Sequence, residues 1–227
     1  MSAVNVVNKT VPASSAPPDE RAGRLFLIIA IALAVTFGAG GLFLIIALNH
    51  HERDAGILPD HPRQLADFSL TDRTGRTITR GDMSGKIVVV DFLLTSCSLT
   101  CPVVNRRMAE VQQLTTNQPD VRFLSLTVDP RTDTPAALMK YGDRFGTDSN
   151  RWFMLTGEKP ALHSLIATSF LTQDLNDPFV YMPGNFSHTE RIALVDAHGQ
   201  VRMYFDGMRP ETTPAIVAEI EKLRKAD

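Results

Sequence analysis

The hydrophobic positions of this chain fall into one long uncharged run followed by a series of shorter ones. Residues 25–48 form the long run, in which 24 successive positions carry no charged side chain. A helix of that length would be about 36 Å long, enough to cross a hydrocarbon core of about 30 Å with some tilt. A cleaved secretory signal has a shorter apolar run, of about 7–15 residues. We therefore expect a retained transmembrane helix at 25–48, between a disordered tail at 1–24 and a polar linker at 49–65.

The charges that flank this run predict its orientation. Arg21 and Arg24 precede it, whereas Arg53 after it is offset by Glu52 and Asp54. The positive-inside rule places the tail in the cytoplasm and the rest of the chain on the other side of the membrane. The tail also carries acidic residues, which transit peptides lack. We expect a single-pass protein of the bacterial inner membrane with its C-terminal domain in the periplasm; the alternative is the mitochondrial inner membrane, with that domain facing the intermembrane space.

From residue 66 onward the shorter apolar runs alternate between the spacing of strands and that of helices. The expected elements are a hairpin at 67–82, a strand at 86–94, a helix from Pro102, a strand at 121–129, a helix at 134–145, a strand at 151–157, a helix at 161–169, strands at 190–196 and 200–206, and a helix at 211–225. This order predicts an α/β domain at 66–227 with a thioredoxin-like fold and an N-terminal hairpin.

Two helices have local signals at their starts. The helix that begins at Pro102 places the apolar residues Met108, Val111 and Leu114 on one face. Thr134 is a good N-cap and is followed by a proline, the residue most suited to a first helical position.

Charge and cysteine content narrow the function. The chain carries 23 Lys and Arg against 25 Asp and Glu, a formal net charge of −2, so nucleic acid is not an expected partner. A domain of this size can bury a sufficient core without disulfides. The two cysteines of the chain, Cys97 and Cys101, are therefore expected to serve chemistry rather than stability.

Cys97 and Cys101 lie in the stretch TSCSLTCPVV, after the strand at 86–94 and at the start of a helix. A helix N-terminus favours the thiolate, which is both a nucleophile and a metal ligand. Residues four apart in a helix have Cα atoms about 6.2 Å apart, within the range of about 4.4–6.8 Å that disulfides accept. The same spacing lets two thiolates face one soft ion such as copper(I) or, less selectively, zinc. The spacing therefore leaves a redox disulfide and a metal site open.

His188 is the candidate for a third metal ligand. It precedes the strand at 190–196, which we expect to lie beside the strand at 86–94, and in a thioredoxin-like sheet that loop faces the thiol pair. The alternative is a loop histidine that is hydrogen-bonded to the backbone.

Other polar residues are less suited to such a site. Asp129 follows a central strand at the edge where α/β sites gather, and we interpret it as a loop-ordering carboxylate, with a supporting role at the site as the alternative. The rest are interpreted as packing, surface or linker residues: His163, His198, Met182, His50, His51 and His61. The alternatives are a metal site at the linker histidines and a thioether ligand at Met182.

Four stretches spread over nearly the whole domain carry a more specific signal than the cysteine pair. They are DFLLTSCSLTCP (91–102), SLTVDPRTDTPAALMKYGDRFG (125–146), RWFMLTG (151–157) and SHTERIALVDAHGQVRMYFDG (187–207). In order and spacing they resemble the SCO/SenC family of membrane-anchored copper proteins, which assist the assembly of cytochrome c oxidase. Ser98 and Ser187 depart from the family, which usually has proline and often aspartate there; neither replaces a ligand.

The resemblance implies a copper ion held by Cys97, Cys101 and His188, and cytochrome c oxidase subunit II as the partner. We expect a membrane-anchored copper metallochaperone. The alternative is a thiol–disulfide oxidoreductase in which Cys97 attacks a partner and Cys101 resolves the mixed disulfide. Two features disfavour that alternative: the spacing is CxxxC instead of CxxC, and no proline occurs between 184 and 209, where thioredoxin-like proteins place a cis-proline.

Overall fold

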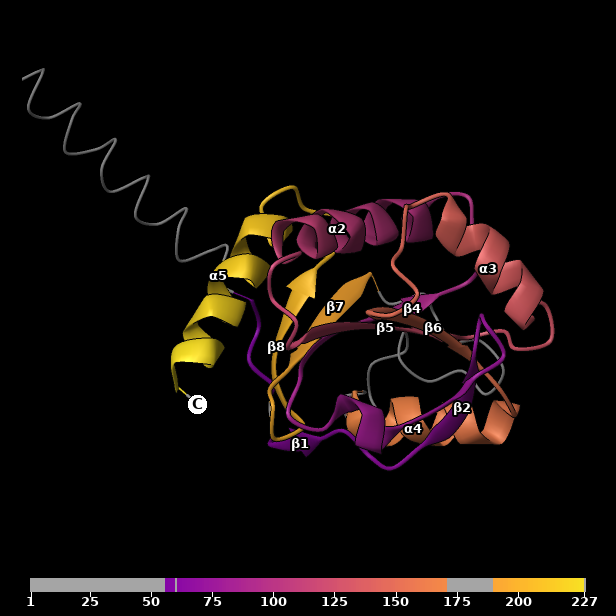
Figure 1. Cartoon of the computed structure of the whole chain (residues 1–227), viewed down its shortest axis with the longest axis horizontal. Coiled ribbons are helices and arrows are strands. Elements are labelled where there is room, and N and C mark those ends of the chain that lie inside the picture. The colour runs from indigo at the N-terminus through magenta and orange to yellow at the C-terminus, as the bar shows by residue number, and fades with distance from the viewer. Residues whose placement is uncertain (1–55, 60, 171–189, 227) are drawn as a thin grey trace, which may run out of the picture. The chain divides into compact units, whose positions relative to one another are not determined.

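The apolar run at 86–94 forms strand β4, Ile87–Leu93, all seven residues of which are buried. It lies within a mixed sheet of eight strands in the order β1-β8-β7-β4-β5-β6-β2-β3. The structure is a computed structural model that describes residues 56–59, 61–170 and 190–226 (Figure 1). The other strands are β1 (Arg63–Gln64), β2 (Ser69–Asp72), β3 (Thr77–Thr79), β5 (Val121–Thr127), β6 (Trp152–Thr156), β7 (Arg191–Val195) and β8 (Gln200–Asp206).

The neighbours of β4 determine which loops lie together. β5 pairs with β4 in parallel along its whole length, from Ile87 opposite Val121 to Leu93 opposite Thr127. β6 continues the parallel part of the sheet beyond β5. β7 lies on the other side of β4 and runs antiparallel to it, which confirms the predicted adjacency of these two strands. The carboxyl ends of β4 and β5 and the amino end of β7 consequently meet at one edge of the sheet.

Helices cover both faces of this sheet. Figure 1 shows α2 and α4 on opposite sides of it. The buried residues of α2, α3 and α5 join one apolar cluster, and those of α4 join the other. The helices are η1 (Arg80–Met83), α2 (Thr100–Leu114), α3 (Pro135–Asp143), α4 (Lys159–Ser169) and α5 (Thr212–Ala226). This is the predicted α/β architecture with an N-terminal β2–β3 hairpin.

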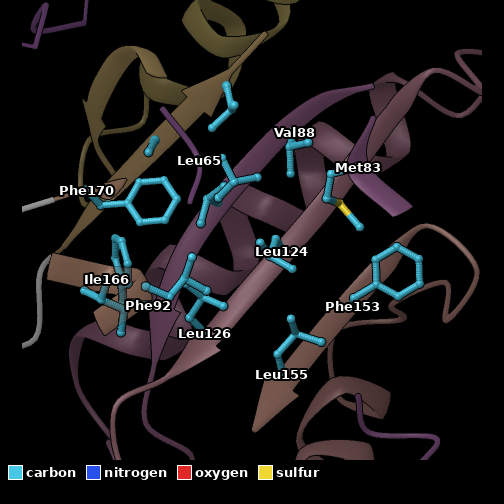
Figure 2. Packing of buried hydrophobic residues seen from close by; sticks show 14 of the residues in the cluster. Leu65, Met83, Val88, Phe92, Leu124, Leu126, Phe153, Leu155, Ile166 and Phe170 are labelled. Atoms are coloured by element: carbon cyan, nitrogen blue, oxygen red, sulfur yellow. The ribbon is translucent and has the colours of Figure 1, made fainter. Parts of the chain in front are cut away.

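The two-sided cover explains why β4 is an unbroken apolar run in the sequence. Val88, Val90 and Phe92 belong to the cluster on the α4 side, part of which Figure 2 shows, whereas Val89 and Leu93 belong to the cluster on the α2 side. Alternate side chains of a strand point to opposite faces, so a strand covered on both faces must be apolar at nearly every position. The one ionisable residue of β4 is therefore exceptional and is described with the site below.

The local helix signals are confirmed at Thr134 and partly wrong in α2. The Thr134 hydroxyl accepts a hydrogen bond from the backbone N–H of Ala137, as an N-cap does. α2 begins two residues before Pro102, so its first turn includes Cys101. Leu114 is 61% exposed, whereas Met108 and Val111 of the same expected face are buried. The buried side of α2 continues from Val111 to Thr115, four residues further along the chain, and so does not include Leu114.

The sheet begins before residue 66, the domain boundary expected from the sequence. β1 pairs with β8, and Ile57 forms an isolated antiparallel bridge with Tyr204. The expected tail at 1–24 and transmembrane run at 25–48 lie outside the described residues. Within the described part of the chain, no helix is both long and apolar enough to span a bilayer.

Leu124 and Leu114 provide a matched test of this packing. Leu124 is fully buried in β5, so Leu124→Ala should lower the free energy of unfolding by about 2–5 kcal/mol through lost transfer energy and a cavity. Leu114→Ala removes the same atoms from an exposed position and should change it by less than about 0.5 kcal/mol. Urea denaturation followed by the fluorescence of the buried Trp152 measures both values. Similar losses in the two variants would contradict the described burial.

Candidate metal and redox site

The two cysteines lie together at the carboxyl end of β4 but in different environments. Cys97 lies in the loop 94–99, where its backbone N–H donates a 3.0 Å hydrogen bond to the carbonyl of Leu94, and its side chain is partly exposed. Cys101 is in the first turn of α2 and only 3% exposed. Both thiols are free in this structure. The structure thus presents one accessible sulfur with a second one buried behind it.

These environments separate the acidities of the two thiols. Burial raises the pKa of Cys97, but hydrogen bonds from the backbone N–H groups of Cys101 and Leu99 and from the Thr100 hydroxyl outweigh this and lower the pKa to about 6. The Thr100 hydroxyl lies 3.7 Å from the Cys97 sulfur. Burial raises the pKa of Cys101 to about 12, and the neighbouring Cys97 thiolate adds to the increase. At neutral pH the pair therefore holds one thiolate and one thiol.

A buried carboxylate, Asp91, supports the turn that carries Cys101. Asp91 has no exposed surface and accepts hydrogen bonds from the hydroxyl of Ser125 and from Asn105 Nδ2 at 3.0 Å. Asn105 Nδ2 also donates to the Cys101 carbonyl at 3.1 Å, and Trp152 Nε1 donates to the Ser125 hydroxyl at 2.7 Å. Burial outweighs these hydrogen bonds and raises the pKa of Asp91 to about 7. The network connects the centre of β4 to the first turn of α2.

A second buried carboxylate, Asp133, supports the loop that carries Cys97. It accepts hydrogen bonds from the backbone N–H and hydroxyl of Thr95 and from the hydroxyl of Thr127. The side chain of Asp129, for which the sequence left a supporting role as the alternative, is partly exposed and accepts a 2.7 Å hydrogen bond from Thr132 within its own loop. Asp129 thus orders its loop, as expected, and Asp133 is the carboxylate that reaches the thiol loop.

Two histidines of the described residues, His198 and His163, do not join the cysteines. His198 lies in the β7–β8 turn, and the antiparallel pairing of β7 with β4 places that turn at the opposite edge of the sheet. His163 lies within α4, which covers the face of the sheet away from α2. His188, Met182, His50 and His51 lie outside the described residues. Across residues 56–59, 61–170 and 190–226, no three or more His, Cys, Asp or Glu side chains gather in a way that could hold a metal ion.

The fold and the thiol pair together define a class. A central β4 followed by a loop and helix that carry two cysteines, one of low and one of high pKa, is the arrangement of a thioredoxin-like dithiol protein. Such a pair can attack a disulfide, form one, or bind a soft metal ion.

The comparisons with known proteins identify the family within this class. The family model SCO1/SenC matches residues 58–225, and the chain belongs to this family. A SCO2-like protein of Rickettsia felis is 26% identical over 187 residues, which cover 78% of this chain and 88% of that protein. Two solved structures share the fold: BsSco, with a TM-score of 0.63 at 22% identity, and yeast Sco1 with copper bound, with a TM-score of 0.58 at 22% identity. They cover 75% and 74% of this chain, and 99% and 96% of their own chains.

The low pKa of Cys97 can be measured without any metal. In the reduced, metal-free protein, the rate of Cys97 alkylation by iodoacetamide should rise with pH around a midpoint of about 6, because the thiolate is the nucleophile. Cys101 should react far more slowly over the same range. Thr100→Val should raise the midpoint, since it removes one of the groups that stabilise the thiolate.

Mass spectrometry of quenched samples assigns each modification to its cysteine. A wild-type midpoint near the value of about 8.5 of an ordinary thiol would contradict the assigned environment of Cys97.

Proposed function

We propose that this protein is a membrane-anchored copper metallochaperone that assists assembly of the copper site in cytochrome c oxidase, with subunit II of the oxidase as its partner. The observation that carries the proposal is the Cys97–Cys101 pair, presented at a helix start by a member of the SCO1/SenC family. Within that family, yeast Sco1 has been solved with copper bound, and BsSco is described as one of the Sco family of cytochrome c oxidase assembly proteins.

The proposed ligands are Cys97, Cys101 and His188. Two thiolates form a soft donor pair suited to copper(I), and an imidazole adds the nitrogen donor that copper(II) prefers. Support for His188 comes from the strand that follows it. β7 begins at Arg191, and its pairing with β4 brings this beginning to the edge at which the thiol loop starts.

The unequal acidities of the thiols have a consequence for metal binding. Cys101 is protonated in the metal-free state and must lose its proton to become a ligand. The positive charge of a bound copper ion favours the thiolate and offsets the effect of burial. Copper uptake by this site therefore releases a proton from Cys101, and affinity increases with pH.

The proposed anchor divides the chain into a cytoplasmic tail at 1–24, a transmembrane helix at 25–48, a short linker after it and the periplasmic domain, whose sheet already includes Ile57. An anchor confines the domain to the membrane that also holds the oxidase. Confinement raises the effective concentration of one partner near the other without any additional contact.

A thiol–disulfide oxidoreductase is the second candidate, and the difference in pKa between the two thiols favours it. The Cys97 thiolate would attack a partner disulfide and release one partner sulfur as thiolate. Cys101, after losing its proton, would attack the Cys97 sulfur, form the Cys97–Cys101 disulfide and release the second partner thiolate. The partner gains the two electrons that this chain loses. The BsSco study concerns a disulfide switch, which is compatible with this chemistry.

Copper titration of the reduced protein tests the copper proposal. With copper(II), the wild type should show a sulfur-to-copper charge-transfer absorption, and His188→Ala should lose or strongly shift this band, because two thiolates without the imidazole are a poor site for copper(II). Copper(I) should still bind to the variant through the thiolates. His198→Ala is the matched control, since His198 lies at the opposite edge of the sheet.

The outcomes of this titration separate the candidates. Identical copper(II) spectra for the wild type and His188→Ala would remove His188 from the site. Protein oxidised to the Cys97–Cys101 disulfide should take up no tightly bound copper, because a disulfide offers no thiolate. Tight copper binding to the oxidised protein would show that the ligands lie elsewhere, for instance at His50 and His51.

Reporter fusions test the proposed topology. A fusion after residue 60, which keeps the run at 25–48 ahead of the reporter, should be active with a reporter that works in the periplasm and inactive with one that works in the cytoplasm. The opposite pattern would overturn both the orientation and the proposed compartment.

A further inference from the structure

Asp133 has an environment that the proposed ligand set does not explain. It has no exposed surface and lies at the end of the loop between β5 and α3. Transfer of an ionised carboxylate out of water is costly unless hydrogen bonds compensate for it. None of the ion pairs seen among the described residues includes Asp133, and the donors that it meets all come from Thr95 and Thr127.

These hydrogen bonds connect two loops that are far apart in the sequence. Thr95 lies two residues before Cys97 and 38 residues from Asp133. Its backbone N–H is 3.2 Å from Asp133 Oδ1 and 3.3 Å from Oδ2, and its hydroxyl also donates to Oδ1. Thr127 is the last residue of β5 and donates its hydroxyl to Oδ2. One carboxylate thus holds the beginning of the thiol loop against the end of the neighbouring strand.

The held residue is close to the accessible thiol along the chain. The N–H of Cys97 donates to the carbonyl of Leu94, so that Leu94 to Cys97 form a turn with Thr95 inside it. A hydrogen bond from the N–H of Val128 to the carbonyl of Leu93 fixes the base of the same loop. The position of Thr95 therefore determines where the turn delivers the Cys97 sulfur relative to the first residues of α2.

We infer that Asp133 is a positioning residue for Cys97, which it holds beside the start of α2 through the hydrogen bonds to Thr95. If Asp133 loses one of its two acceptor oxygens, Thr95 is held less firmly and the turn at 94–97 gains freedom. The Cys97 sulfur then moves away from the backbone N–H groups and the Thr100 hydroxyl that stabilise its thiolate. The reactivity of Cys97 falls as a result, and the geometry of any metal ion bound there changes. Only the second of these effects rests on the proposed copper function.

Asp129 provides a matched control in the same loop. Its carboxylate accepts from Thr132, three residues along the chain, and lies 3.9 Å from the guanidinium of Arg131. Both partners belong to its own loop, so replacement of Asp129 by asparagine perturbs that loop without releasing Thr95.

The test compares Asp133→Asn with Asp129→Asn in the purified full-length protein. Asparagine has nearly the shape of aspartate, but one of its two acceptor oxygens is replaced by an amide donor, so it cannot accept from both threonines as the carboxylate does. In the reduced, metal-free state at pH 7, alkylation of Cys97 by iodoacetamide should be about tenfold slower in Asp133→Asn, because the displaced sulfur loses hydrogen bonds that stabilise the reactive thiolate. Asp129→Asn should react at the wild-type rate.

Two substitutions at Thr95 separate positioning from a general loss of stability. Thr95→Val removes the hydroxyl donor and should slow alkylation in the same direction as Asp133→Asn, whereas Thr95→Ser keeps the hydroxyl and should retain the wild-type rate. The copper(II) charge-transfer band should shift in Asp133→Asn and Thr95→Val. It should stay at the wild-type position in the controls Asp129→Asn and Thr95→Ser. Thr95→Val also tests the inference if Asp133→Asn fails to fold.

Wild-type alkylation rates in Asp133→Asn and Thr95→Val would overturn the inference, even if urea denaturation showed both variants to be less stable. That result would leave Asp133 with a purely structural role. A slower alkylation of Cys97 in both variants would support the inference even if the wild type itself showed no copper band, in which case the proposed copper function alone would fail.

Discussion

The parallel pairing of β4 with β5 is the constraint on which the rest of the structure depends. Residue pairs from Ile87–Val121 to Leu93–Thr127 hold the two strands in register at the centre of the sheet. Parallel strands end at the same edge, so the loop that carries Cys97 and the loop that ends at Asp133 leave the sheet side by side. A slip by one residue would exchange the side chains of β4 between the two apolar clusters and would turn Asp91 away from Ser125 and Asn105.

The chemistry of the thiol pair depends on the difference in burial and hydrogen bonding between Cys97 and Cys101. Cys97 lies before the helix, where backbone N–H groups stabilise a thiolate, whereas Cys101 lies one turn further on, where burial disfavours the charge. The polar network of Asp91 supports the turn of the buried thiol, and burial raises the pKa of this carboxyl to about 7. At neutral pH the thiol pair holds a single negative charge until a cation or a partner sulfur arrives, which suits both copper uptake and thiol exchange.

The choice between these two chemistries comes from the family and not from the geometry of the pair. A dithiol at a helix start occurs in oxidoreductases as well as in metal-binding proteins, and the described residues bring no third ligand to the cysteines. The SCO1/SenC match covers nearly the whole sheet domain, from residue 58 to residue 225. The family therefore favours copper, and the two chemistries remain compatible, since thiolates bind copper only when they are reduced.

The sequence by itself determined the order of strands and helices, the hairpin, the cap at Thr134 and the location of the thiol pair at the end of a buried strand. These features depend on hydrophobic period, turn residues and caps, all of which act over a few residues. The sequence did not reveal that Leu114 would be exposed, that Asp91 would lie beneath Cys101, or that Asp133 rather than Asp129 would reach the thiol loop. The contact between Asp133 and Thr95 joins positions 38 residues apart, and it exists only because the register of β4 on β5 brings two loop ends together. An acidic residue in a loop looks the same in the sequence whether it faces solvent or a neighbouring loop, and only the tertiary structure decides between the two.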